Sequence, residues 1–149
     1  MAKQSGIKDL KAFQNKLKKR IVTNPEKHIK DLVQRSASLV EGEARKSIAS
    51  GNKSGRTYMR GGVPHTASAA GEAPATDTGK LIEGITTKVT TNRTQVIGQI
   101  IANSFNNTPY AKDLEFGTTN MRPRPYMQPA LERNRPKIKR MFEKGGYVD

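Results

Sequence analysis

The sequence predicts an α+β domain with a long N-terminal helix, a small antiparallel β-sheet with an extended arm, and a C-terminal helix packed on the sheet. Three observations predict this fold class. Apolar residues recur three or four apart over residues 25–48, alternate over 85–103, and recur at helical spacing after 128. A chain of 149 residues has the length of one domain. We divide this single domain, residues 1–149, into a helical part (1–50), an extended arm (52–79), and a sheet with the C-terminal helix (80–149).

Two helices are expected before the arm. The first covers residues 7–21 and carries a narrow apolar stripe on a basic helix. The stretch "TNPEK" ends it, because Pro25 disfavours helical backbone at Asn24. The same pair begins the second helix, with Asn24 as N-cap and Pro25 in the first position. This helix ends before Gly51, and Gly42 inside it weakens it by about 1 kcal/mol.

The arm differs from its surroundings in composition. The stretch "GRTYMR" predicts a short edge strand through Tyr58. The residues that follow, 61–79, show no periodicity, and Val63 is their only large aliphatic side chain. Stretches of this kind inside small domains are either disordered or functional loops. We interpret this one as an arm that becomes ordered on a partner surface.

A β-hairpin is expected after the arm. The stretch "TGKLIEGI" forms a helical turn at most, and residues 85–91 then alternate as a half-buried strand. The turn "NRT" leads into residues 95–103, which are apolar on both faces. Apolar residues on both faces predict a central or doubly covered strand.

Residues 110–131, "YAKDLEFGTTNMRPRPYMQPAL", predict a stiff corner between two helices. Asn107-Thr108-Pro109 caps the short helix "YAKDLEF", and Gly117 ends it as a left-handed C-cap. The last helix begins at Gln128-Pro129, and Pro136 predicts a kink or an interruption within it. The side chains expected to fix the corner onto the sheet are Tyr110, Leu114 and Phe116.

Composition predicts a weak core and a basic surface. Only 28 of the 149 residues are Leu, Ile, Val or Phe, and the net charge is +14. Such a chain lies near the composition at which domains stop folding alone, so we expect neighbouring subunits to order its flanks. The charge falls at the two ends, with +10 over residues 1–60 and +5 over 121–149. It fits either nucleic-acid contact or docking to acidic protein neighbours.

The sequence contains few residues or motifs that would support catalysis or metal binding. The chain has no cysteine, and its only histidines are His28 and His65. His65, Glu72 and Asp77 could ligate a metal, but a loop rich in Ala and Gly would not preorganise them. No HExxH, GxSxG or Walker motif occurs. We therefore expect no enzyme, no cofactor and no metal.

Glu115 is the one acid with apolar surroundings in the sequence, and we interpret it as a helix-end carboxylate that forms a salt bridge with Arg122 or Arg124. The N-terminus lacks the apolar core of a signal peptide, and no apolar run reaches the roughly 18 residues of a membrane span. We therefore expect no membrane partner and synthesis in a cytoplasm.

The motifs "YAKDLEFGT" and "RPRPYMQPAL", with "SGRTYMRGG" and "HTASAAGEAPATDTGKLIEGI" upstream, carry a resemblance. Together they resemble the neck and tail-completion family of long-tailed double-stranded-DNA phages, over about residues 54–142. Pro136 and the basic first helix depart from the family pattern. The resemblance implies a structural virion protein in a ring that joins the head connector to the tail and completes the tail end through which DNA passes.

The implied partners are other copies of the chain in a ring, head-side connector or head-completion proteins, the tail terminator or tail tube, and passing DNA bound without sequence specificity. The implied location is the virion neck, after assembly in the host cytoplasm. The residues expected to bind partners are Arg56, Tyr58, Glu115, Phe116, Gly117, Arg122, Arg124, Pro125 and Tyr126. Those expected to face DNA are Lys11, Lys18 and Lys19. The alternative is a basic nucleic-acid-binding accessory protein, which the charge alone suggests.

Overall fold

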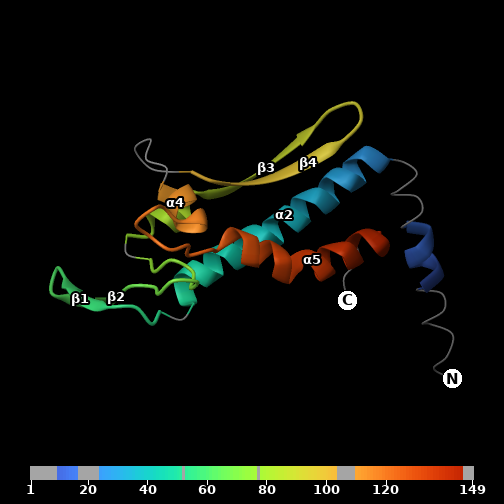
Figure 1. The fold of residues 1–149 in the computed structure, drawn as a ribbon. Helices are drawn as coiled ribbons and strands as arrows, with labels where there is room; N and C mark the ends of the chain where they lie inside the picture. Colours follow the sequence, from blue (N-terminus) through green and yellow to red (C-terminus); the bar gives the residue numbers. More distant parts are fainter. Residues whose placement is uncertain (1–9, 17–23, 52, 77, 104–109, 146–149) are drawn as a thin grey trace, which may run out of the picture.

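The computed structural model describes residues 10–16, 24–51, 53–76, 78–103 and 110–145. The fold is α+β, as predicted (Figure 1). Residues 10–16 are helical. The other elements are α2 (Pro25–Ser50), β1 (Thr57–Arg60), β2 (Val63–Thr66), α3 (Lys80–Glu83), β3 (Ile85–Thr91), β4 (Val96–Ala102), α4 (Tyr110–Phe116) and α5 (Met127–Glu143). The remainder of the predicted helix 7–21, and the predicted cap at residues 107–109, lie outside the described residues.

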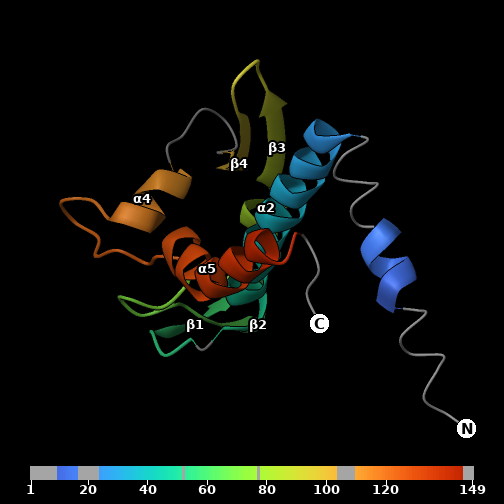
Figure 2. The ribbon, with the colours of Figure 1, turned by 90° about the vertical axis from the view of Figure 1, so that its right-hand side faces the viewer.

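Helix α2 is the central element, and its predicted boundaries are confirmed. The side chain of Asn24 accepts a hydrogen bond from the backbone N–H of Lys27 at 3.0 Å, and Pro25 occupies the first helical position. The helix ends at Gly51. In Figures 1 and 2, the β3–β4 hairpin lies on one side of α2 and α5 lies along another.

The buried core is small and is built around α2. Its main cluster consists of Val40, Ala44, Ile48, Ile85, Leu114, Tyr126 and Ala130. Helix α5 packs along α2 rather than on the sheet as predicted, and its first turn adds Met127 to the cluster that contains Ile85 of β3. Helix α5 continues across Pro136 to Glu143, so of the kink or interruption predicted there, the interruption does not occur.

The β3–β4 hairpin forms as predicted. Its antiparallel register runs from Ile85 opposite Ala102 to Thr91 opposite Val96. In the described part of the chain, this sheet has two strands. The prediction that the second strand is central or doubly covered is therefore wrong, since Ile97 remains exposed on β4.

Residues 53–76 contain more structure than the sequence predicts. The predicted strand through Tyr58 is β1, but it pairs with a second strand, β2, to form a hairpin. The turn is made by Gly61 and Gly62 at φ values of 55° and 83°, which glycine adopts readily. Chain segments beyond the hairpin return to the body of the protein, where Pro74 is fully buried. The described residues of this arm therefore fold within the chain itself, and the interpretation that the arm becomes ordered on a partner surface stays a prediction.

The base of the β1–β2 hairpin is held by Glu72. Its carboxylate accepts hydrogen bonds from the Ser54 hydroxyl at 2.5 Å, the Ala69 backbone N–H at 2.7 Å and the Ser54 backbone N–H at 2.9 Å. These bonds, with a smaller contribution from the charge of Lys53, lower the pKa of Glu72 to about 2.

We expect the Glu72 carboxyl to titrate near pH 2 in an NMR titration, instead of near its ordinary value of 4.5. Because the folded state has the lower pKa, the stabilisation is complete above pH 4.5 and is lost as the pH falls towards 2. Substituting Glu72→Gln should raise hydrogen exchange at the Ser54 and Ala69 amides. A titration midpoint near pH 4.5 would contradict the hydrogen bonds described for the Glu72 carboxylate.

Gly117 is the glycine whose replacement should cost most. Its φ is 77°, and a Cβ atom there would lie 2.6 Å from the Met121 carbonyl oxygen and 2.9 Å from Pro123 Cδ. We expect Gly117→Ala to lower the free energy of unfolding by about 2 kcal/mol, since both the backbone conformation and the contacts oppose it. The matched control is Gly42→Ala, on an open face of α2, which should stabilise by about 1 kcal/mol. Equal effects in urea unfolding would refute the prediction.

Candidate functional site

The corner between α4 and α5 is the region with the most unusual local structure. The Gly117 N–H donates to the Asp113 carbonyl at 2.8 Å, so the chain turns as the predicted left-handed cap. Thr118 and Met121 then form an isolated antiparallel bridge. The Arg124 N–H donates to the Leu114 carbonyl at 2.7 Å and fastens the returning chain to α4. The corner is held by its own backbone.

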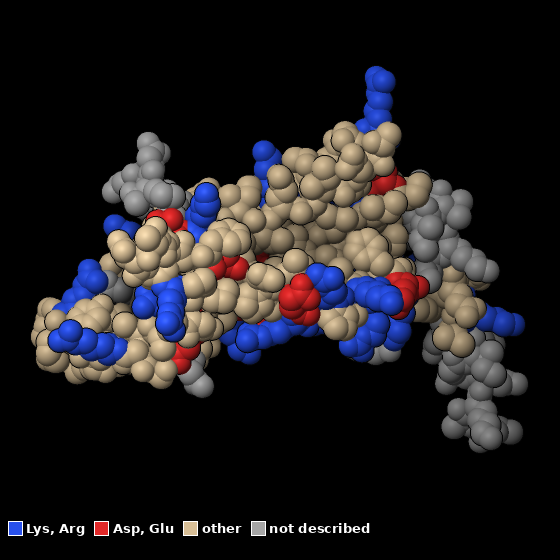
Figure 3. All heavy atoms as spheres, in the orientation of Figure 1, with Lys and Arg blue, Asp and Glu red and all other residues tan. Residues whose placement is uncertain are grey.

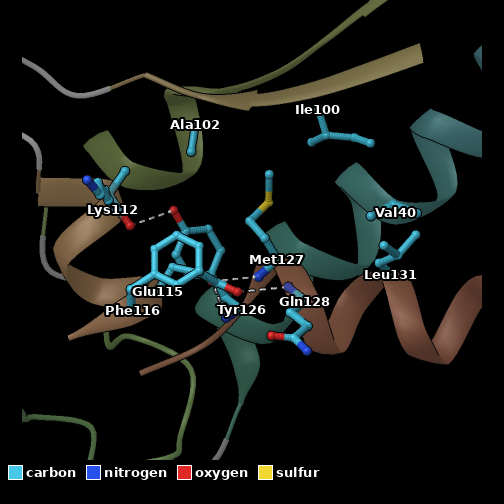
Figure 4. A pocket seen from close by; sticks show the side chains of 11 residues that line it. Val40, Ile100, Ala102, Lys112, Glu115, Phe116, Tyr126, Met127, Gln128 and Leu131 are labelled. Carbon is cyan, nitrogen blue, oxygen red and sulfur yellow. Dashed lines mark hydrogen bonds between the residues drawn. The ribbon is translucent and has the colours of Figure 1, made fainter. Parts of the chain in front are cut away.

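Glu115 connects the two helices of the corner. One carboxylate oxygen accepts the backbone N–H groups of Tyr126 at 2.8 Å and Met127 at 3.0 Å, and the other accepts that of Gln128 at 2.8 Å (Figure 4). The first N–H groups of a helix have no partner within it and favour a negative charge. Glu115 therefore caps the N-terminus of α5 from another helix.

The salt bridge predicted between Glu115 and Arg122 or Arg124 is therefore wrong. The Glu115 carboxylate oxygens face backbone N–H groups, whereas the Arg124 guanidinium donates to the Met121 sulfur at 3.6 Å. Arg122 is exposed on the turn and Arg124 is half-buried. Of the two arginines in the corner that were expected to bind partners, Arg122 is the accessible one.

The prediction for Tyr126 is also wrong. Tyr126 was expected to face a partner, but it is only 1% exposed, and its hydroxyl lies 3.5 Å from the Ala111 carbonyl oxygen. Burial raises the pKa of Tyr126 to about 12, and the nearby Glu115 and Tyr110 add to the rise. Tyr126 is a core residue that attaches the start of α5 to α4.

The aromatic side chains expected to pack on the sheet behave differently. Leu114 is buried as expected, but Tyr110 is exposed and Phe116 is 70% exposed. Of these three side chains, Leu114 therefore lies inside and the two aromatic rings face outward.

A groove of about 440 Å³ lies beside the corner, between α4, the start of α5, α2 and β4 (Figure 4). Its lining residues are Val40, Ile100, Ala102, Ala111, Lys112, Glu115, Phe116, Tyr126, Met127, Gln128 and Leu131. Most are apolar, and Leu131 is an exposed apolar residue on its wall. The sequence did not predict this groove.

The other described residues expected to bind partners or DNA are not among those that line the groove. Arg56 precedes β1, and Tyr58 lies in the exposed β1–β2 hairpin. Pro125 is half-buried. Lys11 is exposed on the helical segment 10–16, whereas Lys18 and Lys19 lie outside the described residues.

The two described residues that were considered for a metal site each have another partner. His65 packs edge-on against Tyr58, with ring centroids 5.2 Å apart, and Glu72 binds the base of the hairpin. Asp77 lies outside the described residues. Among the residues that the structure places, no group of three or more acids and histidines could hold a metal ion. Over the same residues, no helix has the length and apolar character needed to cross a membrane.

Comparison of the chain with family models, curated proteins and solved structures finds no match.

Proposed function

We propose that this chain is a structural virion protein of the phage neck, a subunit of a ring that joins the head connector to the tail. The proposal combines the resemblance of residues 54–142 to the neck and tail-completion family with one structural observation. A small core leaves two separate apolar surfaces exposed, namely the groove at the corner and the β1–β2 hairpin. Surfaces of this kind indicate protein–protein contact.

The chemistry of the groove supports a binding role over catalysis. Its titratable lining residues are Lys112, Glu115 and Tyr126. Both Glu115 oxygens are occupied by backbone N–H groups, and the Tyr126 hydroxyl is buried with a raised pKa. A general base must be free to accept a proton from a substrate, and neither group meets that need.

The distribution of charge supports contact with proteins along most of the surface and weak contact with DNA. In Figure 3, Lys and Arg side chains lie along the hairpin end and the lower margin, with acidic side chains among them. Such mixing favours docking specificity over a continuous phosphate-binding track. The net charge of +14 still attracts DNA, so a nucleic-acid-binding accessory protein is the alternative to test.

Two single substitutions should separate the proposed ring role from the nucleic-acid alternative. We expect Arg122→Ser, on the exposed turn of the corner, to leave DNA-filled heads and unjoined tails in a phage that carries this gene. Lys11→Ser removes one positive charge from the exposed segment 10–16 and should leave joining nearly intact. Electron microscopy of lysates counts joined particles. Loss of joining with Lys11→Ser alone would overturn the assignment of surfaces.

A further inference from the structure

Both faces of the β1–β2 hairpin carry exposed apolar side chains. Its register pairs Met59 with Pro64 and Arg60 with Val63, so Met59 and Pro64 share one face while Tyr58 and Val63 share the other. Met59 is 66% exposed, Val63 65% and Tyr58 41%. Figure 1 shows the hairpin projecting from one end of the molecule. Exposing large apolar side chains to water costs free energy, and a partner that covered them would remove this cost.

The hairpin cannot fill the groove of its own molecule. In Figures 1 and 2, it lies apart from β4, with α4 and α5 between. Its base is fixed by a hydrogen bond from the Gly55 N–H to the Ala67 carbonyl, by another from the Ala67 N–H to the Arg56 carbonyl, and by the hydrogen bonds of the Glu72 carboxylate. Each molecule thus presents an apolar projection and an apolar groove at different places.

We infer that the groove of one copy receives the β1–β2 hairpin of a second copy. The inference rests on the proposed ring role, because it names the contact between neighbouring subunits. The groove volume of about 440 Å³ falls in the range of sites that bury ligands of several side chains' size, roughly 300–1,000 Å³. Met59 suits such a site because its unbranched thioether adapts to an irregular cavity.

Charge and symmetry favour a second copy as the occupant. Residues 53–66 carry Lys53, Arg56 and Arg60 and no acid, whereas α4 has a net charge of −1, from Glu115 and Lys112 on the groove wall and Asp113 outside the lining. A partner that filled only the groove would leave the hairpin uncovered. A contact between two different surfaces of identical copies covers both, and it repeats from copy to copy until a ring closes or a filament forms.

The absence of native cysteine makes this contact directly testable. Arg60→Cys places a thiol at the hairpin tip and leaves Met59 and Val63 in place. Gln128→Cys places one on the exposed rim of the groove. The two full-length variants are mixed at high concentration and treated with a short bismaleimide, and the products are analysed on denaturing gels and by peptide mass spectrometry.

We expect a cross-linked dimer in the mixture and at least five-fold less in either variant alone. The doubly substituted chain should give a ladder of higher oligomers. Adding Met59→Asp to the hairpin variant should reduce the product at least five-fold. The matched control replaces Arg60→Cys by Lys88→Cys, an exposed position on β3, and should give only background.

Cross-linking of the hairpin variant only with itself, equal product from the Lys88→Cys control, or no product would overturn the inference. A larger product with Phe13→Cys than with Arg60→Cys would also overturn it, since the segment 10–16 would then be the occupant. The ring role is assessed separately by particle counts. If heads and tails join only when the chain is present, but the cross-link does not form, the inferred contact is wrong and the proposed function stands. If the cross-link forms, but heads and tails join normally in the absence of the chain, the proposed function is wrong.

Discussion

Replacing Tyr126 by alanine should lower the free energy of unfolding by about 3–5 kcal/mol, the range for removing a buried aromatic side chain. Tyr126 is 1% exposed and packs in the cluster shared by α2, α4 and α5. Its loss leaves a cavity where the corner is attached to the core. Because small domains are stabilised by about 5–15 kcal/mol, much of the protein would unfold at modest urea concentrations.

The measurement is urea unfolding followed by circular dichroism, with Tyr110→Ala as the matched control. Tyr110 lies on the same corner but is exposed, so its replacement should change stability by no more than about 0.5 kcal/mol. If Tyr126→Ala unfolded within about 1 kcal/mol of the wild type, the corner would not be part of the core as described.

The second large effect is expected from Glu115. Substituting Glu115→Ala removes the acceptor of three backbone N–H groups at the start of α5. Capping residues contribute about 0.5–2 kcal/mol, and hydrogen bonds to charged groups contribute somewhat more. We expect a loss of about 2–3 kcal/mol and higher hydrogen exchange at Met127 and Gln128.

Two variants isolate this effect. Glu115→Gln retains one acceptor oxygen and should lie between the wild type and the alanine variant. Asp113→Ala removes a carboxylate two residues earlier on α4, and it should change stability little. Equal destabilisation by Asp113→Ala and Glu115→Ala would indicate a general charge effect and would contradict the cap.

The fold was largely predictable because its signals are local. The Asn24-Pro25 start of α2, the alternation of β3 and the left-handed Gly117 each depend on neighbouring residues. The β1–β2 hairpin was missed although Gly61-Gly62 is a turn signal, because β2 contains a proline and little alternation. Hairpin pairing there follows from the turn more than from the strand sequence.

The candidate site was less predictable because it depends on contacts between distant residues. The sequence indicated that Glu115 was unusual but suggested arginine partners. Its actual partners are backbone N–H groups, and almost every residue type has one, so the sequence does not indicate which of them Glu115 binds. Tyr126 looked like a surface aromatic between prolines, and only the packing of α5 on α2 buries it. The groove combines residues from α2, β4, α4 and α5, so no single stretch of sequence contains it.

The central claim, that this chain joins heads to tails, is tested most directly by removing it. In a phage that carries this gene, an amber mutation at an early codon should yield DNA-filled heads and tails of full length that remain separate under the electron microscope. Adding the purified full-length protein to that lysate should restore joined, infectious particles. Joined and infectious particles in the absence of the chain would contradict the account.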